Sequence, residues 1–331
     1  MRYTVPGFVH RPGIHCGSSA MRNLFAFRGI DLSEPMCFGL GSGAGFLYVP
    51  EHPVSPFVAF HGRIMEMEKE LCGVLSIPFP EREEEDGDAG WEKARAAVLS
   101  GHPVLISTDL AYLAYFETRT HFAGHRVVLF GVDDEGGHAL LSDSEREEAQ
   151  EISVPSLKRS RSSSIPPYPM ENRWCVVKPE GALRPIPKAV PLALEKNARE
   201  MLAPPGGSFA GISGMRRMAE DIPRWPAMTE EFAFAARFGY QVIEKRGTGG
   251  GFFRRMYARY LDEASACFPP LAGPGLAEKM VAVAEGWTEI AGRLKEVSEG
   301  DDTAGLPRVA DLVLRQADRE EVFWREAVSL V

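Results

Sequence analysis

The feature that most constrains the fold of this chain is a proline-rich segment at residues 179–191, because the hydrophobic pattern differs on its two sides. Before it, short apolar runs alternate with helical patterns, which is typical of mixed α and β structure. After it, the pattern is helical almost throughout. A proline-rich segment between two such patterns indicates a linker. We therefore predict an α+β domain at residues 1–183 and a mainly helical domain at residues 184–331, which suits a chain of 331 residues.

The α+β half contains the elements on which the functional argument depends. A helix is expected at about residues 16–28, with Gly29 as its C-terminal stop. Strands are expected at residues 103–108, 126–132 and 138–142, and a serine- and proline-rich mobile loop at residues 156–169. The C-terminal half is predicted to form helices at residues 192–203, 208–221, 229–246, 252–266, 275–298 and 308–329.

Composition and charge argue against several classes of function. The net charge is −9 and no basic stripe is found, so we expect no nucleic-acid binding. No stretch of about 18 apolar residues exists and the N-terminus lacks the apolar core of a signal peptide, so we expect no membrane association and a cytoplasmic location. The five scattered cysteines contain no Cys-x-x-Cys pair and fit neither a disulfide scaffold nor a structural zinc site. Free thiols of this kind are available for chemistry.

Cys16 is the cysteine best placed for catalysis. It lies in the segment G-I-H-C-G-S-S-A-M, where a loop gives way to the predicted helix. The unsatisfied N–H groups of a first helical turn carry partial positive charge and favour the thiolate, which is the attacking species. The ordinary alternative is a small buried hydrophobe, the role that we assign to the other four cysteines. The glycine, histidine and serine neighbours of Cys16 are not core formers, which favours the catalytic interpretation.

His125 and Asp143 are the matching candidates for a base and its orienting group. His125 precedes the strand at 126–132, and Asp143 follows the strand at 138–142. In an antiparallel pair the end of the second strand lies beside the start of the first, so Asp143 can reach His125. Alone, either residue is more simply a strand-end histidine or a turn-forming aspartate. Together with Cys16 they predict a Cys-His-Asp triad.

Four segments carry a family resemblance. H-R-P-G-I-H-C-G-S-S-A, L-S-E-P-M-C-F-G-L-G-S-G-A-G-F and H-R-V-V-L-F-G-V-D-D resemble the N-terminal domain of butirosin biosynthesis protein H. G-T-G-G-G-F-F-R-R-M-Y-A-R-Y-L-D-E-A (247–264) resembles the helical domain of unknown function that accompanies it. That family is similar to papain-like peptidases that process bacteriocin leaders. The resemblance implies a papain-like domain at 1–183, with Cys16 as nucleophile, His125 as base and Asp143 as orienter.

The resemblance also implies a reaction class. The butirosin relative accepts an aminoacyl chain from a carrier-protein thioester and delivers it to an amine. For this chain it implies an amide-forming acyltransferase of specialised-metabolite biosynthesis. Its partners would be an acyl carrier protein or other thioester donor, bearing phosphopantetheine, and a small-molecule amine acceptor, with no cofactor bound to the enzyme itself. A cysteine peptidase or amidase that uses the same triad is the alternative, and a binding module that has lost activity is a third interpretation.

Further residues are candidates for oxyanion or substrate contacts. The leader peptidases have a glutamine six residues before the cysteine, where this chain has His10; His10 either donates to the oxyanion or anchors the loop. No metal is expected, because glycine-containing sequence between His121 and His125 breaks the helix that an i, i+4 zinc pair needs. The remaining candidates are His15, Asp109, Tyr112, Tyr115, Gly41 and Gly43 near the substrate, and Gly249, Gly250 and Arg254 as a contact for the pantetheine phosphate, although a flexible cap also explains the last group.

Overall fold

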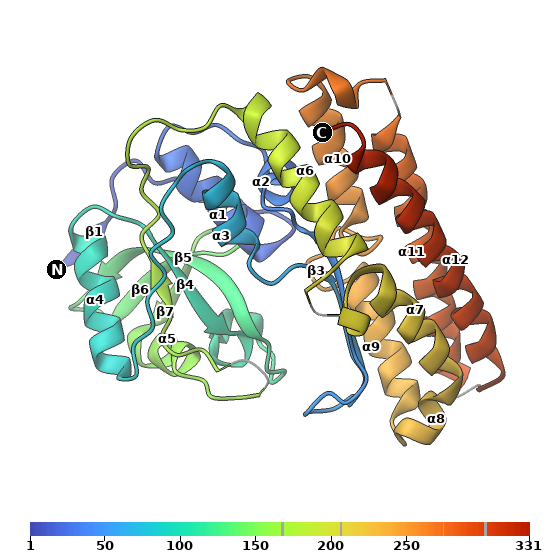
Figure 1. The fold of residues 1–331 in the computed structure, drawn as a ribbon. Coiled ribbons are helices and arrows are strands. Elements are labelled where there is room, and N and C mark those ends of the chain that lie inside the picture. The colour runs from blue at the N-terminus through green and yellow to red at the C-terminus, as the bar shows by residue number, and fades with distance from the viewer. Residues whose placement is uncertain (167–168, 206, 274, 301–302) are drawn as a thin grey trace. The chain divides into compact units, whose positions relative to one another are not determined.

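The computed structural model describes residues 1–166, 169–205, 207–273, 275–300 and 303–331. By its internal contacts the chain divides into two compact units (Figure 1). Unit 1 comprises Met1–Cys37 and Ser76–Leu183, and unit 2 comprises Phe38–Leu75 and Arg184–Val331. The chain passes from unit 1 to unit 2 for the second time between Leu183 and Arg184, within the proline-rich segment. We did not predict that residues 38–75 pack with the helical half.

Unit 1 is built on one antiparallel sheet. Its strands lie in the order β7-β6-β5-β4-β8, with β1 paired to β5. The three predicted strands are confirmed within a few residues, and the register pairs Thr108 with His125 and Val128 with Ser142. The strands are β1 (Arg2–Thr4), β4 (Val104–Asp109), β5 (Ala123–Asp133), β6 (His138–Ser142), β7 (Gln150–Ser153) and β8 (Trp174–Cys175).

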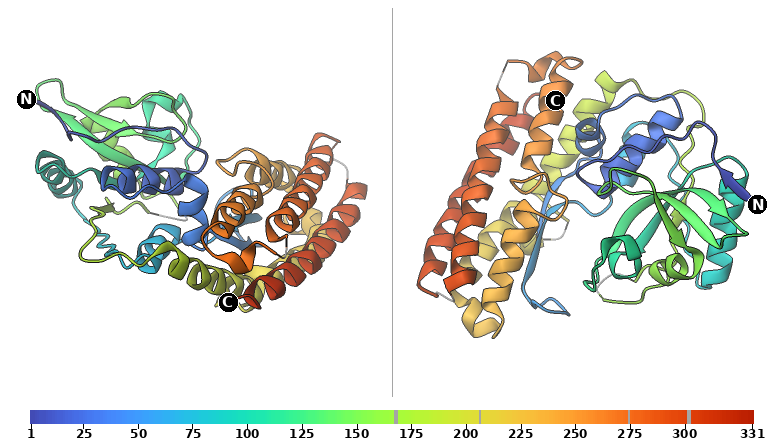
Figure 2. Two further views of the ribbon diagram at one scale, coloured as in Figure 1. Left: turned by 90° about the horizontal axis from the view of Figure 1, so that it is seen from above. Right: turned by 180° about the vertical axis from the view of Figure 1, so that it is seen from behind.

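Helices cover this sheet and close its core. Helices α1 and α4 pack on β5, and α5 packs on β4 (Figure 2). Val127 and Leu129 point into the core with α4 and α5, while Val128 between them is equally buried, so β5 is covered on both faces. The elements are α1 (Cys16–Phe27), α4 (Gly87–Leu99), α5 (Val154–Arg161) and the short 3-10 helices η1 (Leu110–Tyr112) and η2 (Ala114–Phe116).

The predicted mobile loop at 156–169 is wrong in its first part, because residues up to Arg161 form α5. The side chain of Ser153 accepts a hydrogen bond from the Ser156 N–H. Pro155 lies in the first turn, where a backbone N–H would have no partner within the helix, so the N–H that proline lacks is not needed. The Arg161 guanidinium is buried and donates to the carbonyl of Asn172 at 2.9 Å. Burial of this arginine joins the basic helix to the rest of unit 1, while residues 167–168 of the predicted loop lie outside the described residues.

Unit 2 joins a small hairpin to a group of helices, as expected for a helical C-terminal half. The antiparallel strands β2 (Ala44–Val49) and β3 (Ala59–Arg63) contact α7 and α9. Trp225, Trp287 and Trp324 are fully buried in its core. Helix α2 (Glu34–Leu40) begins in unit 1 and ends in unit 2. The unit contains α3 (Met67–Val74), α6 (Ile186–Leu202), α7 (Gly211–Asp221), α8 (Trp225–Met228), α9 (Phe232–Glu244), α10 (Arg254–Ser265), α11 (Leu276–Gly300) and α12 (Leu306–Val328), with 3-10 turns η3 (Gly207–Phe209), η4 (Ile222–Arg224), η5 (Pro269–Leu271) and η6 (Thr303–Gly305).

Within the described ranges, no helix has the length and apolar character that crossing a bilayer requires.

Candidate active site

Cys16 is the first residue of α1. The preceding residue, His15, has extended backbone angles and caps the helix, since its Nδ1 accepts the N–H of Ser18 at 3.2 Å. Cys16 is only partly buried, whereas Cys37 and Cys175 are buried completely. Burial raises the pKa of Cys175 to about 12, so that thiol stays protonated. The partial positive charge of the first turn of α1 therefore acts on a thiol that a ligand can approach.

His125 and Asp143 form a buried hydrogen-bonded pair in unit 1. His125 is the third residue of β5, and Asp143 follows the end of β6. Nε2 of His125 lies 2.8 Å from Oδ2 of Asp143, and the two side chains are 1% and 0% exposed. The hydroxyl of Thr108 on β4 donates to the carbonyl of His125 at 3.0 Å and fixes the backbone there. Because Nε2 is engaged by Asp143, Nδ1 is the ring nitrogen that remains for Cys16.

The charges of these groups reinforce one another. Burial by itself would lower the pKa of His125, but the charge and hydrogen bond of Asp143, together with a hydrogen bond and charge interaction with Cys16, raise that pKa well above its usual value. Burial raises the pKa of Asp143, yet its interactions with His125 and its other donors lower it overall. Both directions favour an imidazolium beside a carboxylate. An imidazolium next to Cys16 stabilises a thiolate.

Tyr115 and Arg146 complete the environment of the pair. The Tyr115 hydroxyl donates to Oδ2 of Asp143 at 2.8 Å. Burial, followed by the charge of Asp143, raises the pKa of Tyr115 well above its usual value, so the hydroxyl stays a donor. Arg146 donates to the Tyr115 carbonyl at 2.8 Å and lies 4.3 Å above the Phe116 ring, whose centroid is 5.5 Å from that of His125. We predicted Tyr115 only as a cleft residue, since nothing in its sequence position relates it to Asp143.

His10 ties the loop before Cys16 to the strand that leads to Asp143. Its Nδ1 lies 2.8 Å from the hydroxyl of Ser142, and its Nε2 lies 3.0 Å from the carbonyl of Arg146. Asn23 of α1 donates to the same Ser142 hydroxyl at 3.2 Å. Both ring nitrogens of His10 are therefore engaged inside unit 1. This arrangement supports the anchoring role of His10 over an oxyanion contact.

Glu34 holds the turn that enters α1, a role that we did not predict. Its carboxylate accepts the N–H of Ile14 at 3.0 Å, the N–H of His15 at 2.8 Å and the hydroxyl of Ser18 at 3.2 Å. A Cβ at Gly13 would lie 2.7 Å from the Glu34 carboxylate, so only glycine fits at this position. The sequence signal was present, because Gly13 and Glu34 both lie in segments that carry the family resemblance.

Asp109 and Tyr112 organise a loop at the same end of the sheet as His125. The buried carboxylate of Asp109 contacts Nδ1 of His121 and accepts the hydroxyl of Ser163, each at 2.7 Å. The ring of Tyr112 packs edge-on against His121 at 5.6 Å. The Asp109 carboxylate is thus engaged by the protein itself, which leaves Tyr112 and His121 as the more accessible members of this group. Within the described ranges, no three His, Cys, Asp or Glu side chains gather in a way that could hold a metal ion.

The glycine candidates near residue 40 belong to unit 2. A Cβ at Gly41 would lie 2.6 Å from the carbonyl of Met67, and a Cβ at Gly43 would lie 2.7 Å from the carbonyl of Phe38. These glycines therefore allow the chain to pack closely within unit 2.

The prediction that Arg254 contacts a phosphate is wrong. Its side chain is fully buried and pairs with Glu320, with Nε and Nη2 at 3.1 and 2.9 Å from the carboxylate oxygens. Its remaining donors reach the carbonyls of Gly62 at 2.7 Å and Gly45 at 2.9 Å. The hydrogen-bond donors of the guanidinium are thus used within the protein, and the side chain links the β2–β3 hairpin to the helices.

Gly249 and Gly250 form a turn whose donors are also used internally. Both have positive φ, 70° and 79°, which glycine adopts without strain. The N–H of Gly250 donates to the Thr248 hydroxyl at 3.1 Å, and the next N–H, of Gly251, donates to the Glu244 carboxylate at 3.1 Å. A carboxylate already occupies the place that an anion would take, which favours the cap interpretation of this segment.

Two protein-family models match the chain, one after the other along the sequence. Residues 15–144 match the N-terminal domain of butirosin biosynthesis protein H, and residues 155–327 match a domain of unknown function (DUF4872). The chain belongs to the butirosin biosynthesis protein H family. The first match begins one residue before Cys16 and ends one residue after Asp143, so it includes His125 as well. The family name links these proteins to biosynthesis. No curated protein matches the chain.

Proposed function

We propose that this protein is a biosynthetic enzyme that transfers an acyl group through Cys16 to an amine acceptor. The observation that carries the proposal is the arrangement of Cys16 at the start of α1 beside a buried His125–Asp143 pair with a 2.8 Å hydrogen bond. This order of thiol, imidazole and carboxylate is the one that nucleophilic catalysis by cysteine requires. A papain-like fold for unit 1 is part of the proposal.

The first half-reaction forms an acyl-enzyme. The Cys16 thiolate attacks the carbonyl carbon of a thioester and forms a tetrahedral intermediate, whose oxyanion the Cys16 N–H in the first turn of α1 would stabilise. When the intermediate collapses, the bond to the donor sulfur breaks. His125 gives its proton to the departing thiolate. The products are acyl-Cys16 and a free donor thiol, and Asp143 holds His125 in position throughout.

The second half-reaction forms the amide. An amine attacks the acyl-Cys16 carbonyl, and neutral His125 accepts the proton that the amine loses. Collapse of the second tetrahedral intermediate releases the amide and restores the thiolate–imidazolium pair. Water must be kept from the acyl-enzyme, because attack by water gives a carboxylic acid instead. The donor in this proposal is an acyl carrier protein or another thioester with a phosphopantetheine arm, and the acceptor is a small molecule.

The same residues would also serve a cysteine peptidase or amidase, which is the second candidate. The membership of the chain in a biosynthetic family supports the transferase, because a biosynthetic enzyme joins the acyl group to an acceptor molecule. A hydrolase would transfer the acyl group to water. Incubation with an acyl thioester in the presence and absence of an amine distinguishes the two. An amide product that forms only with the amine indicates the transferase. Release of the free acid at an unchanged rate in both cases indicates the hydrolase.

The mechanism is tested by intact-protein mass spectrometry after incubation with an acyl thioester of N-acetylcysteamine. We expect one acyl group on the wild-type protein and none on Cys16→Ala. Cys267→Ala is the matched control, since Cys267 is the other partly buried cysteine. Its thiol donates to the Ala264 carbonyl, and burial raises its pKa. Acylation that survives in Cys16→Ala, or that is lost in Cys267→Ala, would contradict the assignment of Cys16.

A further inference from the structure

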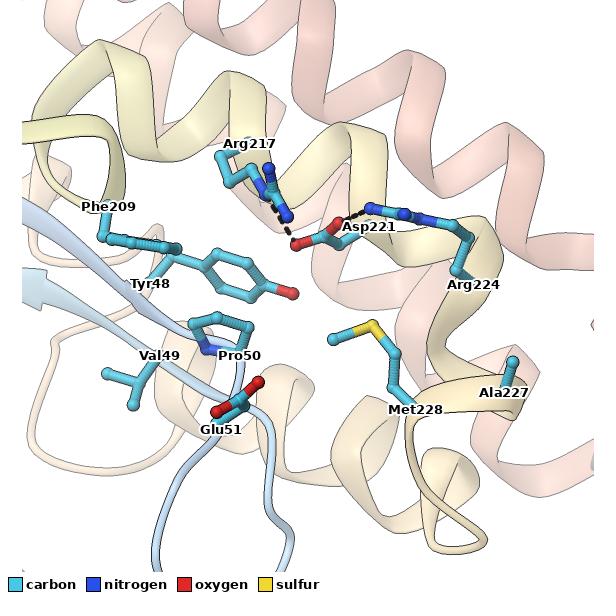
Figure 3. Close-up of a pocket in the computed structure, with 10 residues that line it drawn as sticks. All are labelled: Tyr48, Val49, Pro50, Glu51, Phe209, Arg217, Asp221, Arg224, Ala227 and Met228. Atoms are coloured by element: carbon cyan, nitrogen blue, oxygen red, sulfur yellow. Dashed lines mark hydrogen bonds and ion pairs between the residues drawn. The ribbon is translucent and has the colours of Figure 1, made fainter.

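Unit 2 contains a cavity of about 660 Å³, and its lining does not include Cys16, His125 or Asp143 (Figure 3). It lies between the end of β2 and the segment from η3 to α8. Its volume falls within the range of about 300–1,000 Å³ that is typical of small-molecule sites. The wall combines apolar and charged side chains from both chain segments of unit 2, Phe38–Leu75 and Arg184–Val331. The lining residues are Tyr48, Val49, Pro50, Glu51, Phe209, Arg217, Asp221, Arg224, Ala227 and Met228.

A buried carboxylate organises the positive side of this cavity. Asp221 is fully buried at the end of α7 and accepts a hydrogen bond from Nε of Arg217 at 3.0 Å and another from Nη2 of Arg224. The hydroxyl of Tyr48, which also lines the cavity, accepts the indole N–H of Trp225 at 3.2 Å. The two guanidiniums are thereby held on one wall, as Figure 3 shows.

Both arginines keep N–H donors that are not engaged by the residues that the structure describes. Among the residues that the structure describes, hydrogen bonds engage only Nε of Arg217 and Nη2 of Arg224. Their side chains are 43% and 59% exposed, so the remaining N–H groups are accessible to a ligand. Two arginines and one aspartate give this wall a net charge of +1. Such a wall suits a single carboxylate, which guanidinium groups bind with paired hydrogen bonds.

The remaining wall is apolar and exposed. Phe209 and Met228 are 40% and 39% exposed, which is high for such large apolar side chains. In Figure 3 Phe209 lies on one side of the space and Met228 on the other, with Pro50 between them. An apolar ligand body between these side chains would remove their surface from water.

Glu51 is a second lining carboxylate, besides Asp221, and it opposes an anion. It is exposed, and in Figure 3 it lies across the space from Asp221 and the two arginines. Solvent and salt screen its charge more than they screen an ion directly hydrogen-bonded to the guanidiniums. We propose that this cavity binds a small monocarboxylate with an apolar body, held by Arg217 and Arg224. A phosphate monoester, which carries up to two charges, is repelled more strongly by Glu51 and Asp221 than a monocarboxylate is.

Calorimetric titration of the full-length protein tests the proposal, with phenylbutyrate as the probe. We expect phenylbutyrate to bind at millimolar or lower concentration, and phenylbutanol, phenylbutylamine and phenyl phosphate to bind more weakly. The double variant Arg217→Gln, Arg224→Gln should weaken binding of phenylbutyrate by at least about tenfold, because two charge-assisted contacts are lost. Arg293→Gln is the matched control, since Arg293 is an exposed arginine of α11 paired with Glu296.

A second variant keeps the test informative if loss of both arginines disturbs the buried Asp221. Glu51→Gln leaves the hydrogen bonds of Asp221 to the two arginines in place and should strengthen phenylbutyrate binding, because it removes the lining carboxylate that is not paired with them. The proposal is overturned if phenylbutyrate does not bind, or if the double arginine variant binds it as well as Arg293→Gln does. Weaker binding by Glu51→Gln, or tighter binding of phenyl phosphate, overturns the monocarboxylate class. None of these measurements depends on the chemistry proposed for Cys16.

Discussion

Asp143→Asn isolates the contribution of charge to the reactivity of Cys16, because the two side chains have nearly the same shape. The Asp143 carboxylate accepts hydrogen bonds from His125 and Tyr115, both at 2.8 Å, and from the N–H of Glu145 at 3.1 Å. An asparagine has one acceptor oxygen, so its NH₂ group must oppose a donor on one side. The loss of such a bond in a buried site costs about 1–3 kcal/mol.

The electrostatic loss is larger than the loss of the hydrogen bond. The charge centres of a carboxylate and an imidazolium joined in this way lie about 4 Å apart, and at an effective dielectric constant of about 20 their attraction is about 4 kcal/mol. Without that attraction, burial lowers the pKa of His125 and only the interactions with Cys16 oppose this effect, so the neutral imidazole becomes more favourable. Because about 1.4 kcal/mol corresponds to a tenfold change in rate, the reaction of Cys16 at neutral pH should slow by up to about 10³-fold.

The assay is the rate of Cys16 alkylation by iodoacetamide as a function of pH, followed by intact mass. We expect the Asp143→Asn variant to react slowly at neutral pH and to recover in alkaline solution, where the thiol ionises without help. Asp134→Asn is the control, since Asp134 is exposed beyond the far end of β5 and bonds Arg95 at 2.8 and 2.7 Å. If Asp143→Asn reacts at neutral pH as fast as Asp134→Asn, the ion-pair reasoning is refuted.

The same pair makes stability depend on pH in a defined direction. The pKa of His125 is raised on folding, so its contribution is present below its unfolded pKa and is lost as pH rises through its folded pKa. The pKa of Asp143 is lowered, so its contribution is present above its unfolded pKa and is lost as pH falls through its folded pKa. Urea unfolding should therefore show the largest difference between wild type and Asp143→Asn at intermediate pH. A difference that stays constant across the pH range would contradict both shifts.

Further substitutions test the turn before α1 in unit 1 and the buried Arg254–Glu320 ion pair in unit 2. Gly13→Ala places a Cβ 1.9 Å from the Ser19 hydroxyl and 2.7 Å from Glu34, so it should destabilise the protein by about 1–3 kcal/mol and slow Cys16 alkylation; normal stability with a normal rate would contradict the tight turn. Arg254→Met leaves Glu320 buried without its partner and should cost about 3–5 kcal/mol in urea unfolding. Adding Glu320→Leu should restore part of that loss, and an additive double variant would argue against the pair.

The local sequence was sufficient to predict the elements that carry the candidate triad. The apolar run Val127–Phe130 and the helical pattern after Cys16 gave strands and a helix close to the observed ones, because each pattern has the period of its element. The order of two adjacent antiparallel strands then related Asp143 to His125. This part of the site was predictable because hairpin geometry depends on short-range sequence alone.

Contacts between distant segments were not predictable in the same way. Arg254 was expected at a phosphate because arginine beside glycines suggests an anion site, yet its charge is neutralised by Glu320, which is 66 residues away. Residues 38–75 were expected to belong with the N-terminal half, yet they pack with the C-terminal helices. In each case the partner that decides the role lies far away in the sequence, and no local pattern reports it.

The sequence by itself therefore determined α1, β5 and β6 and, in or directly after them, the candidate thiol, imidazole and carboxylate, since periodicity and strand order are properties of short segments. Only the tertiary structure decided which charges are buried and paired. In the tertiary structure Glu34 hydrogen-bonds to the turn before Cys16, Tyr115 donates to Asp143, and Asp221 accepts from the arginines of the cavity in unit 2. The physical reason is that burial makes an ion pair or hydrogen bond obligatory, and burial is a property of the packed molecule.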